Sequence, residues 1–118
     1  ASGAITSFMD RVFFSAGGRL RGKPAACVAS ARRAGTTATL DQLLKYIYIC
    51  GLPIVPSQYW AMVHGTKAED VAQDLEGLQI MRTLAKNMAW MLKSFEAGRA
   101  AGVNPPEPEA PVRTNFIR

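Results

Sequence analysis

The chain has 118 residues, which is enough for one domain at most. Hydrophobic residues make up 48% of it and charged residues 19%, a composition that excludes a disordered chain. The sequence contains neither a run of about 18 apolar residues, which a membrane span needs, nor a recognisable secretory signal. Two cysteines, Cys27 and Cys50, exclude a disulfide-dense secreted scaffold and favour a reducing compartment, so we expect a cytoplasmic protein.

The charge balance is basic, with 14 Lys and Arg against 9 Asp and Glu, or +5. A basic chain raises the possibility of nucleic-acid binding. However, the basic residues are scattered, and no zinc-finger, homeodomain or RNA-recognition signature is present. The densest groups are Arg19, Arg21 and Lys23, followed by Arg32 and Arg33. We therefore expect an anion-binding surface, with neither nucleic acid nor a membrane as partner.

The first quarter of the chain predicts a helix followed by a strand. Ser2 is a candidate N-cap, and Gly17 and Gly18 are expected to end a helix over residues 2–15. A short apolar run at 25–29 lacks helical periodicity and predicts a strand buried on both faces, as in parallel sheets. The helical face repeats at spacings of three and four: Ile5, Phe8, Met9, Val12 and Phe13.

The next segment predicts a second helix and a second strand. A loop at 30–36 precedes a capping box, in which Thr39 is followed by Gln42 three residues later. The helix that begins there is expected to end near Gly51. The apolar run 52–56, bounded by prolines, is the second predicted strand.

A long third helix and an extended tail complete the chain. Thr66 and Glu69 form a second capping box, and the helix continues to about Ala97 with a possible break near Gly77. The tail from Asn104 is rich in proline and is expected to be extended. The apolar stripe of the helix comprises Val71, Leu75, Leu78, Met81, Ala85, Met88, Leu92 and Phe95.

The order helix–strand–helix–strand–helix indicates an α/β fold with a doubly wound parallel sheet. Two parallel strands alone make a poor sheet, because each keeps a bare edge. The first helix also has a well-formed apolar face but no strand before it. We therefore infer that residues 1–103 are the latter half of such a domain and that residues 104–118 are its tail.

Ligands of open α/β sheets bind beyond the carboxyl ends of the strands. This rule selects the loops 30–36 and 57–65, together with the helix start at 1–3, whose free N–H groups favour an anionic or electron-rich ligand. Arg32 and Arg33 either clamp an anion or are simply solvated.

The second of these loops contains the aromatic pair Tyr59 and Trp60. Three interpretations of this pair are open: an aromatic wall for a flat ligand, a plug for the core, or a dimer contact.

The sequence lacks the residue patterns that several kinds of chemistry require. His64 is the single histidine and cannot build a metal site or a catalytic triad alone. Cys27 and Cys50 are too far apart in sequence for a metal or redox motif, and we expect them to be small buried side chains. Glycine-rich phosphate loops are missing as well. We therefore predict no metal site and name no catalytic side chain.

Four segments resemble the NADPH-dependent FMN reductase family, flavodoxin-like proteins that include the iron–sulfur flavoproteins. Residues 1–11 (ASGAITSFMDR) are similar to the segment after the family's third strand. Residues 30–35 (SARRAG) resemble the loop after the fourth strand, and residues 57–60 (SQYW) the loop after the fifth. Residues 114–118 (TNFIR) are similar to tails of this group.

The resemblance implies a flavodoxin-like parallel sheet of strand order 2-1-3-4-5 with FMN at its carboxyl edge. This chain would supply the carboxyl-terminal half, and its partner would be the missing amino-terminal half of the same domain. The FMN phosphate loop, and the cysteines of any iron–sulfur cluster, would lie upstream. Family members are commonly homo-oligomers with the flavin near a subunit boundary.

The resemblance also implies a flavin-binding set: Ser2, Gly3, Ala31, Arg32, Arg33, Tyr59 and Trp60. The first two would flank the flavin ring, and the next three would offer N–H groups or positive charge to its pyrimidine side. The two aromatic residues would close the site from their own or a neighbouring subunit.

The implied function is an FMN-dependent oxidoreductase that passes electrons from NAD(P)H to a small acceptor such as a flavin or quinone. The alternative is a non-enzymatic flavodoxin-like binding or assembly module. A helical DNA-binding protein is disfavoured, because such a fold has no use for the buried Ala/Val strand.

Overall fold

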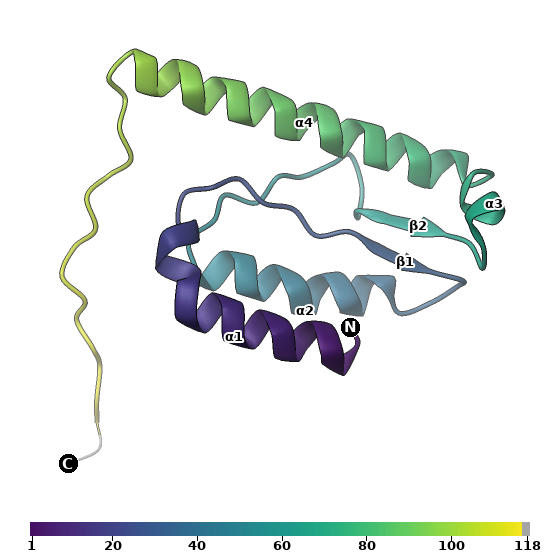
Figure 1. Cartoon of the computed structure of the whole chain (residues 1–118), viewed down its shortest axis with the longest axis horizontal. Helices are drawn as coiled ribbons and strands as arrows, with labels where there is room; N and C mark the ends of the chain where they lie inside the picture. Colours follow the sequence, from purple (N-terminus) through teal and green to yellow (C-terminus); the bar gives the residue numbers. More distant parts are fainter. Residues whose placement is uncertain (117–118) are drawn as a thin grey trace.

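A computed structural model describes residues 1–116 as two parallel strands between helices (Figure 1). Helices α1 and α2 lie on one side of the strands and α4 lies on the other. The parallel α/β architecture expected from the sequence is confirmed. The elements are α1 (Gly3–Leu20), β1 (Ala29–Ala31), α2 (Thr36–Ile49), β2 (Met62–His64), α3 (Ala68–Val71) and α4 (Leu75–Ala100).

The two strands pair in parallel, with Ala29 opposite Met62 and Ala31 opposite His64. An isolated parallel bridge joins Ala25 to Ile54 further upstream. The second strand path is longer than the first between these two pairings, so residues 56–60 leave the sheet and return to it.

The two predicted strands are therefore only partly correct. Regular pairing in the first begins at Ala29, where the predicted run ends, and the exposed side chain of Val28 contradicts burial on both faces. In the predicted second strand, 52–56, only Ile54 pairs; the regular strand is β2. Leu52 and Val55 are buried by packing, and the run bonds the first strand path only around this bridge, where Ala25 donates to Pro53 and accepts from Val55, each at 2.9 Å.

The first helix does not stop at its glycine pair. A Cβ at Gly17 would lie 2.7 Å from the sulfur of Cys50, so this glycine allows α1 and α2 to approach closely. The helix continues to Leu20, and the chain turns at Gly22, which has a φ of 76°. The glycine is therefore a packing residue in this helix.

The second helix begins three residues earlier than its predicted capping box. Gly35 is its N-cap, with a φ of 88°, and Thr36 is its first residue. The Thr39–Gln42 capping box is wrong, because both side-chain oxygens accept hydrogen bonds from the amino group of Ala1, each at 3.2 Å.

The long third helix is two helices in the structure. The break lies at residues 72–74, before the predicted position at Gly77, and Asp74 caps α4 by accepting from the N–H of Gly77 at 2.9 Å. The Thr66–Glu69 capping box is also wrong. The carboxylate of Asp70 instead accepts from the N–H of Thr66 at 3.0 Å and from that of the next residue at 3.1 Å.

The core lies mainly between the sheet and α2. Ala29, Leu40 and Met62 form a buried cluster, against which Cys27 and Leu44 pack. On the other side, α4 buries three residues, Gly77, Ile80 and Leu84. The predicted stripe on α4 is thus displaced by part of a turn, since Leu75, Ala85 and Leu92 are exposed and its other members are half-buried.

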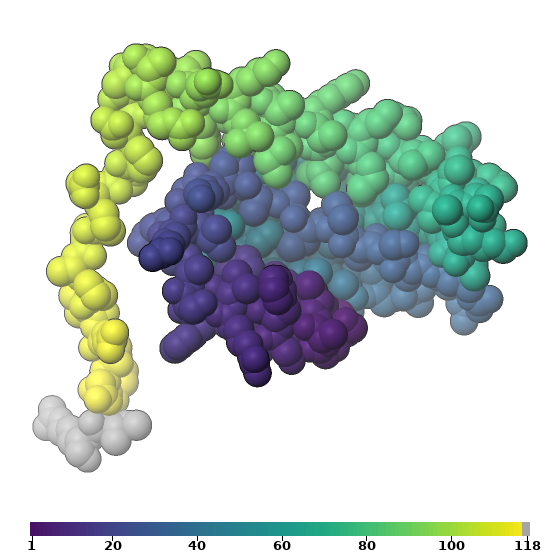
Figure 2. Space-filling model, viewed as in Figure 1, coloured from purple at the N-terminus to yellow at the C-terminus, as the bar shows by residue number. Residues whose placement is uncertain are grey.

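The tail stands clear of the rest of the molecule (Figures 1 and 2). From Asn104 to Phe116 it is exposed and has no helix or strand, as expected from its prolines. Ile117 and Arg118 lie outside the described residues. Within residues 1–116, no helix combines the length and the apolar character that crossing a membrane requires.

Candidate functional site

A cavity of about 330 Å³ opens where three elements end: the start of α1, the carboxyl end of β1 and the start of α2. It is formed by this topology, because a strand and the helix that follows it meet at the carboxyl edge of a parallel sheet. Its lining consists of Ala1, Ser2, Ser30, Ala31, Ala34, Gly35, Thr36 and Thr39.

The starts of helices α1 and α2 direct hydrogen-bond donors toward this cavity. The N-cap Gly35 has no side-chain acceptor, so the first N–H groups of α2 have no capping partner among residues 1–116. At the start of α1, the hydroxyl of Ser2 accepts from the N–H of Ile5, at 3.4 Å. Unpaired N–H groups and the positive end of the helix dipole favour an electron-rich or anionic group.

Thr36 fixes the start of α2 to the sheet. Its side chain is buried, and its hydroxyl donates to the sulfur of Met62 at 3.2 Å. Because Met62 begins β2, this contact joins the second strand to the helix start that lines the cavity.

The sequence predicted part of this cavity. Ser2 and Ala31 line it, and Gly3 follows Ser2 as the first residue of α1. Arg32 and Arg33 lie in the exposed turn between β1 and α2, beside the cavity but outside its lining. Within the described part of the chain, neither guanidinium has a hydrogen-bond or ion-pair partner.

Tyr59 and Trp60 lie elsewhere. They precede β2, so their expected position after the carboxyl end of a strand is wrong. Their rings, with centroids 6.3 Å apart, border a second cavity of about 400 Å³, which also contacts Cys27, Leu40 and Leu44. A flavin contact made by this pair from a neighbouring subunit stays a prediction.

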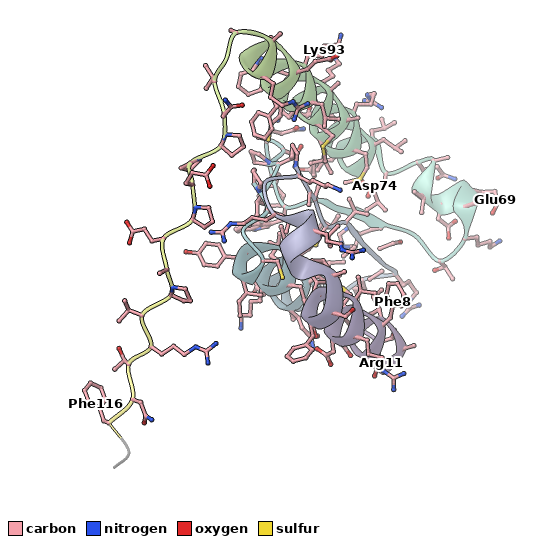
Figure 3. All side chains as sticks on the ribbon, turned by 60° about the vertical axis from the view of Figure 1, so that its left-hand side comes forward. Phe8, Arg11, Glu69, Asp74, Lys93 and Phe116 are labelled. Carbon is pink, nitrogen blue, oxygen red and sulfur yellow. The ribbon has the colours of Figure 1, made fainter. Side chains whose placement is uncertain are left out.

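His64 and Asp74 form a contact that the sequence analysis did not anticipate. His64 ends β2, and its backbone N–H donates to Oδ2 of Asp74 at 2.7 Å; its Nδ1 lies 3.9 Å from the same oxygen. Hydrogen bonds from the N–H groups of Gly77 and His64 lower the pKa of Asp74. Asp74 lies at the junction of α3 and α4 (Figure 3).

Gly35 and Thr36 lie in the predicted site loop 30–36, but they were not named among the site residues and were not predicted to begin a helix. The available signal was the glycine immediately before two threonines, which is typical of a helix start, but a capping-box match further along displaced the expected boundary.

Within residues 1–116, no group of three His, Cys, Asp or Glu side chains could hold a metal ion. Both cysteines are free, and burial raises the pKa of Cys27, so its thiol stays protonated. The cavity at the sheet edge is lined by residues with hydroxyl groups and by the start of α2, and Arg32 and Arg33 lie beside it.

A comparison with family models matches residues 1–67 to NADPH-dependent FMN reductases. This match spans more than half of the 118 residues and includes the three element ends that form the cavity. The chain belongs to the NADPH-dependent FMN reductase family. Family members are NAD(P)H-dependent oxidoreductases that use FMN. Searches of curated proteins and of solved structures found no match.

Proposed function

We propose that this chain is part of an FMN-dependent oxidoreductase that passes electrons from NAD(P)H through FMN to a small acceptor such as a flavin or quinone. The observation that carries the proposal is the cavity at the carboxyl edge, where Ser2 and Ala31 meet the uncapped start of α2. The family match supports the same cofactor.

The residues present fit the pyrimidine end of a flavin. That end carries two carbonyl oxygens and the ring nitrogen N1, which accept hydrogen bonds from N–H groups, and an N3–H group, which donates one. The first N–H groups of α2 offer such donors, and their positions are fixed because Thr36 is buried against Met62. When bound, FMN supplies the hydride and electron transfer, while the protein supplies orientation and electrostatics.

Arg32 and Arg33 supply positive charge beside the cavity. They lack partners among residues 1–116, so their charge is not neutralised within the described chain. A positive potential here favours negative charge on a bound ring and attracts anionic dinucleotides. We therefore assign these residues an electrostatic role rather than a proton-transfer role.

The outer edge of β1 supports the proposal that further strands complete the domain. Ala25, Ala29 and Ala31 use their backbone groups to bond the second strand path. Alternate residues of a strand direct their backbone groups to its other edge, so Val28 and Ser30 direct theirs away from β2. No strand within residues 1–116 pairs there. We propose that the amino-terminal half of the domain, including the FMN phosphate loop, pairs at this edge.

The test is to measure flavin absorbance and NAD(P)H oxidation on the intact protein supplied with FMN. We expect a flavin-bound protein that oxidises the nicotinamide and reduces an added quinone. Arg32→Gln with Arg33→Gln is expected to weaken FMN or nicotinamide binding by about tenfold, a typical cost of losing charge-assisted contacts.

The matched control is Arg19→Gln with Lys23→Gln. It removes the same charge near the other end of α1, which is an 18-residue helix. We expect this control to leave flavin binding unchanged. A protein that binds no FMN contradicts the proposal, and one that binds FMN without oxidising NAD(P)H is a flavodoxin-like binding module instead.

A further inference from the structure

Tyr59 and Trp60 border a cavity that is separate from the one at the sheet edge, since the two share no lining residue among residues 1–116. Its volume of about 400 Å³ lies within the range of small-molecule sites. It opens between the middle of α2, which contributes Leu40 and Leu44, and the chain that leads into β2. We call it the aromatic cavity.

The path of the backbone creates the aromatic cavity. The two strand paths pair at Ala25 and Ile54, and again at Ala29 and Met62. The second path uses four more residues than the first between these pairings, so residues 56–60 loop away from the sheet and leave a hollow against α2. The cavity is therefore a consequence of the fold and not a chance arrangement of surface side chains.

The loop that forms one wall of the cavity is held at both ends. At its start, the side-chain amide of Asn87 on α4 donates to the carbonyl of Pro56 at 2.9 Å. At its end, the N–H of Met62 donates to the carbonyl of Trp60 at 2.8 Å. A wall that is fixed in advance lowers the entropy lost when a ligand binds.

The aromatic cavity is apolar and uncharged. Its inner wall belongs to the protein core, because Leu40 is part of the buried cluster and Cys27 and Leu44 pack against that cluster. None of the described residues that line the cavity is acidic or basic, and burial raises the pKa of Cys27, so its thiol adds no charge. A charged ligand would lose hydration here without gaining a partner. The cavity therefore suits a neutral molecule and not the phosphates of FMN or a nicotinamide dinucleotide.

The rim of the cavity favours a flat ring with one polar atom. Tyr59 and Trp60 are 59% and 55% exposed, and their ring planes are inclined by 59°. Exposed aromatic rings beside an apolar hollow can stack on a planar molecule or meet it edge to face. The side-chain amide of Gln58, which also lines the cavity, makes one hydrogen bond among residues 1–116, with the hydroxyl of Ser57 at 2.9 Å. It therefore keeps free hydrogen-bonding positions for a ligand.

The aromatic cavity stays accessible if further strands join the sheet. Ile54, in its wall, belongs to the strand path that bonds the inner edge of the first path through Ala25. Additional strands are proposed to pair at the opposite, outer edge of β1. The cavity is thus separate from the surface that the rest of the domain would cover.

We propose that the aromatic cavity binds a flat, uncharged aromatic molecule of two fused rings that carries a carbonyl oxygen. Tyr59 and Trp60 contact the ring system, Leu40 and Leu44 contact its apolar edge, and the amide of Gln58 donates to the oxygen. The proposal does not depend on flavin binding, because this site uses none of the residues that line the cavity at the sheet edge.

The experiment is calorimetric titration of the intact protein with coumarin, an uncharged two-ring lactone. We expect saturable binding at one site per chain, with a dissociation constant below about 1 mM. Trp60→Leu should raise this constant about threefold to tenfold, whereas Trp60→Phe, which keeps an aromatic ring, should raise it less than about twofold. The matched control is Trp90→Leu, at a comparably exposed tryptophan on α4 outside the cavity, which should leave binding unchanged.

A second variant tests the hydrogen bond to the carbonyl oxygen. Gln58→Leu should raise the dissociation constant for coumarin about threefold, a typical effect of one neutral hydrogen bond. Gln73→Leu is the matched control, because Gln73 is also exposed but lies outside the cavity. Equal constants for the two variants would contradict the assignment of Gln58 as the donor.

A titration in saturating FMN separates this site from the proposed flavin site. We expect the dissociation constant for coumarin to be unchanged, and NMR shift changes to centre on the amides of residues 57–61. A protein that binds coumarin but no FMN supports this inference and contradicts the proposed function.

Three results would overturn the inference: no saturable binding of coumarin up to millimolar concentration, equal effects of Trp60→Leu and Trp90→Leu, or displacement of coumarin by FMN. Far-ultraviolet circular dichroism of each variant separates loss of binding from loss of folding.

Discussion

The two faces of the sheet differ in how completely they are packed. On one face, Leu40 and Met62 are buried together, and Thr36 ties the start of α2 to β2. On the other face, the 26-residue helix α4 buries three residues, as many as the 14-residue helix α2, while Leu75, Trp90 and Leu92 are exposed. The difference indicates that α4 has more apolar surface than two strands can cover, which fits a sheet with further strands on the outer edge of β1.

The largest change in the free energy of unfolding is expected from a substitution on the well-packed face, compared with one on the face covered by α4. Leu40→Ala removes a side chain that is 3% exposed, and we expect it to lower the free energy of unfolding by about 2–5 kcal/mol. Leu75→Ala, at a position on α4 that is 75% exposed, should change it by no more than about 0.5 kcal/mol. Urea unfolding measures both. Equal losses would contradict the difference between the faces.

The adjacent glycines of α1 provide a matched pair for the packed face. Gly17→Ala places a methyl group 2.7 Å from the sulfur of Cys50 and should destabilise the fold by about 1–3 kcal/mol. A Cβ at Gly18 meets nothing within 4 Å, so Gly18→Ala should stabilise the helix by about 0.5–1 kcal/mol. Thermal melts compare them. A similar change from both substitutions would show that α1 and α2 are not closely packed.

Asp74, which caps α4 on the incompletely packed face, makes the stability of the fold depend on pH. Its pKa is lowered in the folded state by the N–H groups of Gly77 and His64, so the charged carboxylate is the form that stabilises the fold. The stabilisation is fully present above the unfolded pKa of about 3.9 and is lost as the pH falls through the lower folded value. Asp74→Asn should therefore flatten the acid side of the stability profile. An unchanged slope in urea midpoints between neutral pH and the acid limit would contradict this role.

The smallest effect is expected in the rates of amide hydrogen exchange and not in the free energy of unfolding. In the chain of residues 1–118, the amide of Ala29, which donates to Ala61 at 3.0 Å, should exchange with deuterium more slowly than those of Val28 and Ser30. Pairing of further strands should slow exchange at Val28 and Ser30 as well. Hydrogen exchange measured by NMR resolves the individual amides. Uniform protection across these three residues in the 118-residue chain would mean that the outer edge of β1 is already paired.

The sequence was sufficient for the order of elements and for the position of the cavity, because both follow from hydrophobic periodicity and from the topology of parallel sheets. Ser2 and Ala31 were found in this way. It was insufficient for the second strand, because the apolar run 52–56 pairs through a single bridge at Ile54, whereas β2 is only three residues long and ends in His64. Periodicity also could not tell which of two neighbouring apolar stripes on α4 faces the sheet.

Local capping patterns failed for a related reason. Thr39 and Gln42 have the residue types and spacing of a capping box, yet their oxygens bind the amino group of Ala1. Gly17 is a residue type that often ends a helix, but here it lies within α1 and leaves room for the side chain of Cys50. In each case a contact distant in sequence determined the role, and a single sequence does not reveal such contacts.

The central claim is that the cavity at the starts of α1 and α2 receives a flavin. The most direct measurement is hydrogen exchange of the intact protein with and without FMN. We expect slower exchange at the first amides of α2, Thr36 and Thr37, and at Gly3. FMN that binds without slowing these amides, or that instead protects residues at the far end of α4, would contradict it.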